Sequence, residues 1–114
     1  MNPRAIECTE FYQGPTSKIP TATPIEVTTT STEISAANSL RKHIILQNNG
    51  TQPVIIRLGT GAASTTTYNF TLSKSTAARD GLGGSITIKN YQGAIQGIVG
   101  ASTTEIAVTE ILKE

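Results

Sequence analysis

Along most of this chain, apolar and polar residues alternate over short stretches, and residues that favour turns separate those stretches. A period of two places successive side chains on opposite faces of a β-strand. In residues 42–47, for example, Ile44 and Leu46 fall on one face while His43, Ile45 and Gln47 fall on the other. The pattern predicts about seven strands. Their expected ranges are 24–30, 42–47, 54–58, 68–72, 85–89, 94–99 and 105–112.

Turn signals between these ranges predict how the strands are connected. Asn49-Gly50 lies between the ranges 42–47 and 54–58, and this dipeptide readily adopts the positive φ of a tight hairpin turn. We therefore expect those two strands to pair as a hairpin. Residues 34–39 read as a bend, and residues 73–84 read as a long loop. Short strands at regular spacing predict an all-β fold, a small antiparallel β-sandwich of jelly-roll or immunoglobulin type.

Composition supports this fold class and limits its size. The chain has 114 residues, which is the size of one domain. It contains fourteen Ile and nineteen Thr, and these β-branched residues suit the pleated surface of a sheet. Good helix formers are scarce and scattered. One hydrophobic core between two sheets is the expected result.

The first part of the chain does not share this pattern. Residues 1–22 contain three prolines and no alternation, so we predict an extended N-terminal arm at 1–22 and a β-sandwich domain at 23–114. Aromatic and large apolar side chains are favoured at protein contacts. The arm's candidate contact residues are Ile6, Phe11, Tyr12 and Ile19. They could dock on the arm's own domain or on a neighbouring subunit, and an extended arm can add as a strand to a sheet edge.

Charge and residue inventory exclude several classes of function. The net charge is +1 with no basic cluster, which argues against nucleic-acid binding, and no apolar run is long enough to span a membrane. Cys8 is the single cysteine and His43 the single histidine, so we expect no metal site, no cofactor and no catalytic triad. The glycine-rich stretch at 81–84 lacks the lysine of a phosphate-binding loop. We therefore expect a protein that is not an enzyme.

Four residues in the body of the chain are candidates for loop contacts with a partner. Arg79 and Asp80 lie in the long loop, where they form either a solvated charge pair or a contact surface. Tyr68 and Tyr91 lie next to predicted turns. Exposed loop aromatics are what a receptor- or glycan-binding module would require.

Three segments together carry a resemblance to a known group of proteins. They are RKHIILQNNGTQPV at 41–54, YQGAI at 91–95 and IAVTE at 106–110. The pattern covers residues 36–111 and resembles small structural proteins of tailed-phage virions, among them capsid decoration (cement) proteins. The resemblance implies a homotrimer that binds the major capsid protein on the outer capsid surface and stabilises the shell after synthesis in the host cytoplasm. A head-tail adaptor or neck protein, a fibre-attachment protein and a receptor- or glycan-binding module are the alternatives.

Overall fold

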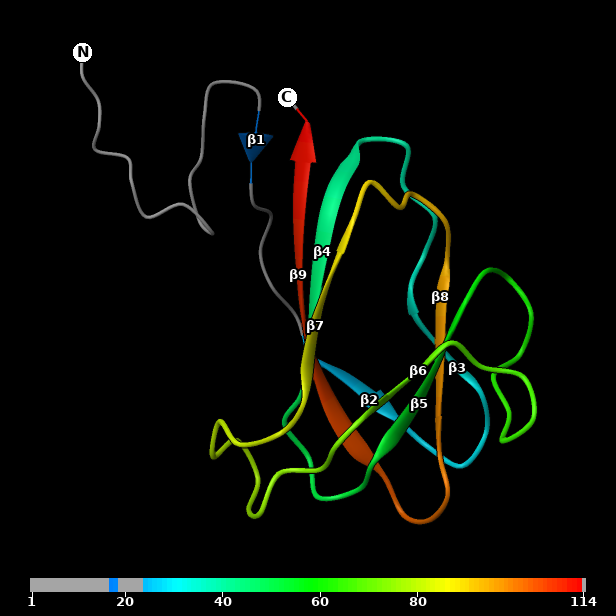
Figure 1. Ribbon diagram of the computed structural model, residues 1–114, viewed down its shortest axis with the longest axis vertical. Helices are drawn as coiled ribbons and strands as arrows, with labels where there is room; N and C mark the ends of the chain where they lie inside the picture. The colour runs from blue at the N-terminus through cyan, green and yellow to red at the C-terminus, as the bar shows by residue number, and fades with distance from the viewer. Residues whose placement is uncertain (1–16, 19–23, 114) are drawn as a thin grey trace.

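The chain forms two antiparallel β-sheets that pack face to face (Figure 1). The computed structural model describes residues 17–18 and 24–113, and no helix in that part of the chain could cross a membrane. The strands are β1 (Ser17–Lys18), β2 (Ile25–Val27), β3 (Thr32–Ser35), β4 (Arg41–Asn48), β5 (Val54–Leu58), β6 (Phe70–Leu72), β7 (Ser85–Lys89), β8 (Ile95–Val99) and β9 (Thr104–Lys113). This confirms the predicted all-β sandwich.

Strand order identifies the sandwich as a jelly roll. Sheet A has the order β1-β9-β4-β7, with β2 also paired to β9, and sheet B has the order β3-β8-β5-β6. From β2 onward, every connection passes from one sheet to the other except the one between β5 and β6. This alternation is the double Greek-key arrangement of a jelly roll.

The core lies between the sheets and consists mainly of β-branched side chains. Ile44 and Leu46 face inward from β4 as predicted, and both are fully buried. The other buried members are Val27, Ile34, Val54, Ile56, Leu72, Ile95, Val99 and Ile106. Each of these side chains contributes roughly 1.5–3 kcal/mol by leaving water. The alternation therefore marks the buried face of β4 correctly at these two positions.

The predicted Asn49-Gly50 hairpin is wrong. β4 pairs with β7 and β9 in sheet A, whereas β5 pairs with β6 and β8 in sheet B. The glycines with positive φ among the described residues are Gly59 and Gly81, so Gly50 does not serve a primed turn. A Cβ atom at Gly50 would instead lie against the Thr104 side chain and 2.7 Å from the Glu105 backbone nitrogen. Close approach to β9 is the physical reason for glycine here.

The predicted bend at 34–39 hides an edge strand. β3 pairs with β8, with a register shift between Glu33 and Ser35, and Ile34 is its buried hydrophobic residue. A strand with one inward apolar residue has too little alternation to be recognised. Opposite it, a Cβ atom at Gly97 would lie 2.6 Å from Ile34 Cδ1, so the glycine makes room for that side chain.

Part of the predicted arm belongs to sheet A. Ser17 and Lys18 of β1 pair with Lys113 and Leu112 at the end of β9. The arm's candidate contact residues lie outside the described residues; they are Ile6, Phe11, Tyr12 and Ile19.

Candidate functional site

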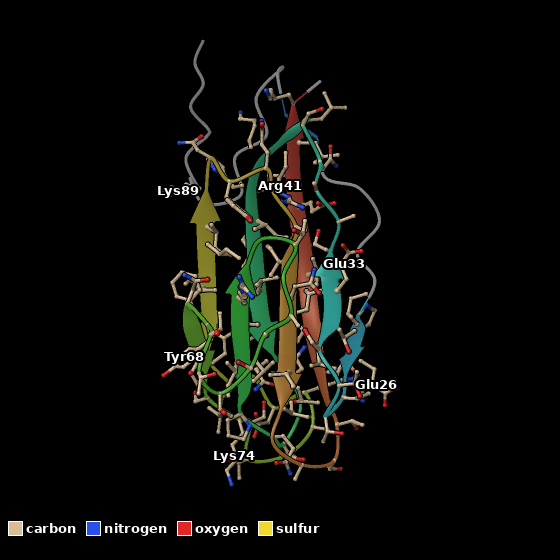
Figure 2. All side chains as sticks on the ribbon, turned by 90° about the vertical axis from the view of Figure 1, so that its right-hand side faces the viewer. Glu26, Glu33, Arg41, Tyr68, Lys74 and Lys89 are labelled. Atoms are coloured by element: carbon tan, nitrogen blue, oxygen red, sulfur yellow. The ribbon has the colours of Figure 1, made fainter. Side chains whose placement is uncertain are left out.

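Arg41 is fully buried between the two sheets near one end of the sandwich (Figure 2). Strict alternation from Ile44 and Leu46 would point Arg41 outward. A register shift between Arg41 and His43 in the pairing of β4 with β9 reverses this direction. Such a bulge inserts one residue and re-aims the side chain next to it.

Every N–H group of the Arg41 guanidinium has a partner. Nε donates to Glu110 Oε2 at 3.0 Å. Nη1 donates to the carbonyl oxygens of Tyr91 and Gly93 at 3.2 and 2.8 Å. Nη2 donates to Ser35 Oγ at 2.8 Å and to the Ala36 carbonyl oxygen at 2.7 Å. The five bonds connect β3, the β7–β8 turn and β9 to the start of β4. The buried cation therefore holds segments of the two sheets together.

The Arg41 cluster explains the sequence pattern that resembled virion proteins. Besides a Gln-Asn-x-Gly turn and a returning strand, that pattern contains an arginine before an Ile/Leu strand, a late Tyr-x-Gly and a final strand with glutamate. In the fold, Arg41 meets Tyr91, Gly93 and Glu110. These residues form hydrogen bonds with one another inside the sandwich. Their role is therefore structural, and unrelated proteins with a similar fold can share it.

Asn48 forms a second buried polar cluster at the other end of β4. Its Nδ2 donates to the carbonyl oxygens of Gln52 and Leu72 at 2.7 and 3.3 Å. Its Oδ1 accepts from the Gly50 N–H at 3.1 Å and from Thr104 Oγ1 at 2.7 Å. Sequence reasoning treated this segment as a turn and missed the cluster. Both clusters are internal, so neither offers an open catalytic site.

Arg79 and Asp80, predicted as loop contacts, both interact within the chain. The Arg79 side chain is 68% exposed and forms an ion pair with Glu105, with Nη2 and Oε1 2.7 Å apart. Glu105 lies directly opposite Glu26 across β9 and β2, so Arg79 offsets a repulsive cross-strand pair. The exposed guanidinium still leaves this position open to a partner, and the contact role remains a prediction.

Asp80 organises the loop that carries Arg79. Its Oδ1 accepts from the Leu82 N–H and its Oδ2 from the Ala77 N–H, at 2.9 and 2.8 Å. These backbone hydrogen bonds, with that from Leu82 the stronger influence, lower the pKa of the Asp80 carboxyl below its usual value of 3.8. At pH values above this usual pKa, the ionised carboxylate fully stabilises the loop. The stabilisation is lost as the pH falls through the lowered pKa of the folded state.

We expect Asp80→Ala to loosen this loop without disturbing the core. Amide exchange at Ala77 and Leu82 should accelerate about threefold or more, because each N–H loses its acceptor. Hydrogen exchange measured by NMR near neutral pH tests this. Asp80→Asn is the matched control, since it keeps one acceptor oxygen and should protect one of the two amides. Unchanged exchange in Asp80→Ala would contradict the proposed role of the carboxylate.

The two candidate tyrosines lie in different environments. Tyr91 is partly buried against the core, and its hydroxyl donates to the Ala94 carbonyl oxygen at 2.8 Å. Tyr68 is 50% exposed and precedes β6, so it lies outside the strand that was predicted to begin at residue 68. Tyr91 belongs to the Arg41 end of the sandwich, and the structure does not bring the two rings together.

Tyr68 borders a shallow groove of about 440 Å³ on the outer face of sheet B. The lining residues are Gln52, Pro53, Ile55, Thr65, Tyr68, Thr71, Gly100 and Ala101, none of which is charged. Within the described part of the chain there is no group of three His, Cys, Asp or Glu residues that could hold a metal ion. The groove can therefore bind by shape and apolar contact, with hydrogen bonds at its rim.

Comparisons with known proteins correct the functional interpretation of the sequence. No protein-family model and no curated protein matches the chain. A similar solved structure is described as "Bacillus endospore appendages form a novel family of disulfide-linked pili". The two are 20% identical with a TM-score of 0.49, over 95% of this chain and 96% of that chain, and this similarity concerns the fold alone.

The interpretation as a phage virion protein is wrong by this comparison. The similar solved structure comes from an endospore appendage, and nothing in the comparisons supports a capsid decoration protein or a location on a phage capsid. The physical reason lies in the Arg41 cluster, because the residues that carried the resemblance are used inside the fold.

Proposed function

We propose that this protein is a structural subunit that assembles with copies of itself through the open edges of its jelly roll. The observation that supports the proposal is the free outer edge of β7. Within the described residues, β7 pairs with β4 and with no other strand. An unpaired edge presents N–H and C=O groups that can pair with a strand of another molecule.

The direction of the β7 backbone groups follows from hydrogen bonds at both ends of the strand. The Asn90 N–H donates to the Lys42 carbonyl oxygen, and the Asn48 N–H donates to the Gly84 carbonyl oxygen. In an antiparallel pair, hydrogen-bonded and non-hydrogen-bonded pairs alternate. Thr87, which lies opposite Ile45, is therefore in a non-hydrogen-bonded pair. Its N–H and C=O point away from β4, toward the free edge.

The sequence of β7 does little to prevent such pairing. Edge strands are usually protected by proline, bulges or charged side chains. β7 pairs with β4 in continuous register, contains no proline and carries one charge, at its last residue Lys89. The edge strands of sheet B are less open, since β3 has a register shift and β6 spans three residues. β7 is thus the edge best suited to a second copy.

The proposal includes no catalytic step. The buried ionisable side chain Arg41 is paired with Glu110, and the exposed Arg79 is paired with Glu105. The major capsid protein, expected as a partner from the virion resemblance, does not enter the proposal. A second copy of this chain is the partner that we infer.

We expect the full chain to self-associate with rising concentration, and Thr87→Pro to weaken that association at least about tenfold. Proline removes an N–H that points to the free edge and no hydrogen bond to β4, so the fold should persist. Sedimentation velocity over a concentration series measures the effect.

The matched control is Thr87→Ala, which changes the same side chain but keeps the N–H. It should assemble like the unchanged chain, and circular dichroism should show that both variants are folded. A full chain that stays monomeric at high concentration would refute the proposal. Equal weakening by both variants would mean that the β7 edge is not involved.

A further inference from the structure

The groove on the outer face of sheet B is a built feature of the fold. The loop 59–69 covers one part of this face: Ala63 is buried and its N–H donates to Ser31 Oγ at 2.9 Å. The ends of the loop are fixed, because the Gly59 N–H donates to the Ala94 carbonyl oxygen and the Asn69 N–H donates to the Ile56 carbonyl oxygen. The loop thereby holds Tyr68 at the rim of the uncovered part.

The uncovered part presents apolar side chains where an isolated sandwich would present polar ones. Ile55 faces outward between Ile98 of β8 and Thr71 of β6, its cross-strand neighbours. Pro53 and Ala101 continue the apolar surface toward the turn end of the sandwich. Because no lining residue is charged, an aromatic side chain could enter without leaving a charge buried and unpaired.

We propose that this groove receives Phe11 and Tyr12 from the N-terminal arm of a second copy. This inference rests on the proposed self-assembly and names the surface that the arm would use. The two adjacent rings account for two of the chain's five aromatic residues. A phenyl ring fits against Pro53 and Ile55, and the Tyr12 hydroxyl can bond to the polar rim.

Chain length excludes the arm of the same copy. The arm joins the described chain at Ser17, which pairs with Lys113 at the end of β9. Phe11 precedes Ser17 by six residues, so it can lie at most about 22 Å away. Pro53 and Ala101 lie beyond the Thr104 end of the ten-residue β9, which is about 30 Å along the strand from Ser17. They also belong to the opposite sheet, which is displaced from sheet A by about 10 Å in the perpendicular direction. Phe11 and Tyr12 of one copy therefore reach the groove of another.

Site-specific photo-crosslinking in the full chain tests this placement. Tyr12 is replaced by p-benzoylphenylalanine, ¹⁴N- and ¹⁵N-labelled chains are mixed and assembled, and cross-linked peptides are identified by mass spectrometry after irradiation. The expected products join position 12 to peptides that contain residues 52–55, 65–71 or 100–101. They should occur as mixed isotope pairs, which only contacts between copies can produce.

A matched pair of variants gives a second readout. Ile55→Glu places a charge in the groove, and Ile45→Glu places the same charge at a half-buried outward position of β4 in sheet A. We expect Ile55→Glu to weaken self-association at least about tenfold and Ile45→Glu to change it less than about twofold. Circular dichroism establishes that each variant is folded. Should Ile55→Glu not fold, Thr71→Glu at an exposed position of the same groove replaces it.

The possible failures are distinguishable. A full chain that stays monomeric refutes both the proposed function and this inference. Assembly with cross-links from position 12 to other surfaces, or with single-isotope products alone, refutes the groove inference and leaves self-assembly standing. Equal effects of Ile55→Glu and Ile45→Glu on association would also overturn the groove inference.

Discussion

Arg41→Met is expected to remove a large part of the stability of this domain. The guanidinium is fully buried and donates to Glu110, Ser35 Oγ and three carbonyl oxygens. Removing one member of a buried ion pair leaves the other uncompensated, which costs about 3–5 kcal/mol. Folded domains of this size are stable by about 5–15 kcal/mol in total. The variant should therefore be largely unfolded under mild denaturant.

Urea denaturation followed by circular dichroism measures this change in the free energy of unfolding. The matched control is Arg57→Met, because Arg57 lies outward on β5 and donates one hydrogen bond, to the Ala62 carbonyl oxygen. The control should lose no more than about 1 kcal/mol. A comparable loss in both variants would show that the Arg41 cluster does not hold the sheets together.

Asn48→Asp is expected to destabilise the fold by about 3 kcal/mol at neutral pH. The substitution keeps the side chain's size and the Oδ1 that accepts from Gly50 and Thr104. It replaces the Nδ2 donor with a carboxylate oxygen that faces the carbonyl oxygens of Gln52 and Leu72. A buried anion next to two acceptors is unfavourable, so burial should raise the pKa of the new carboxyl.

The penalty should depend on pH in a defined direction. In the unfolded chain an aspartate has a pKa of about 3.9, below the raised value in the folded state. Below that pH both states are protonated, and the neutral carboxyl can donate to one carbonyl oxygen, so the penalty is small. As the pH rises toward the folded-state pKa, the penalty grows, and above it the penalty is constant. Urea denaturation between pH 3 and pH 8 measures this dependence.

Asn69→Asp is the matched control for this experiment. Asn69 is exposed, and its Oδ1 accepts from the Leu58 N–H, which a carboxylate can replace. Its stability should change little across the same pH range. A flat pH dependence for Asn48→Asp would show that water reaches the buried cluster and that its donors are not essential.

Variants inside the sandwich and variants on its surface should affect assembly for different reasons. Arg41 and Asn48 lie inside the sandwich, so their variants should alter assembly through loss of the folded subunit. Thr87 on the β7 edge and Ile55 in the groove lie on the surface, and their variants should alter assembly while the fold persists. Measuring unfolding and association for each variant separates the two causes.

Local pattern was sufficient for those features of the fold that depend on neighbouring residues. The ranges 54–58 and 85–89 coincide with β5 and β7, and the inward positions Ile44 and Leu46 follow from the period of two. β-branched composition indicated a sheet protein. These inferences work because the direction of a side chain along a strand is set by backbone geometry within a few residues.

Which strands pair with each other could be seen only in the tertiary structure. Asn49-Gly50 indicated a hairpin, yet the chain crosses from sheet A to sheet B there, because Asn48 and Gly50 bond across to β9 and to the following loops. A strand was predicted to begin at Tyr68, but β6 begins at Phe70, and the fixed loop 59–69 holds Tyr68 at the rim of the groove. Such contacts join residues far apart in sequence, which alternation does not specify.

The sequence by itself determined the all-β sandwich and the inward direction of Ile44 and Leu46. Only the tertiary structure decided that the sandwich is a jelly roll and that Arg41 points inward. It also decided that the described residues leave the outer edge of β7 unpaired and the groove uncovered. The reason is physical: periodicity reports which side of a strand is buried, whereas a bulge, a crossing between sheets or an unpaired edge depends on which distant strand lies beside it.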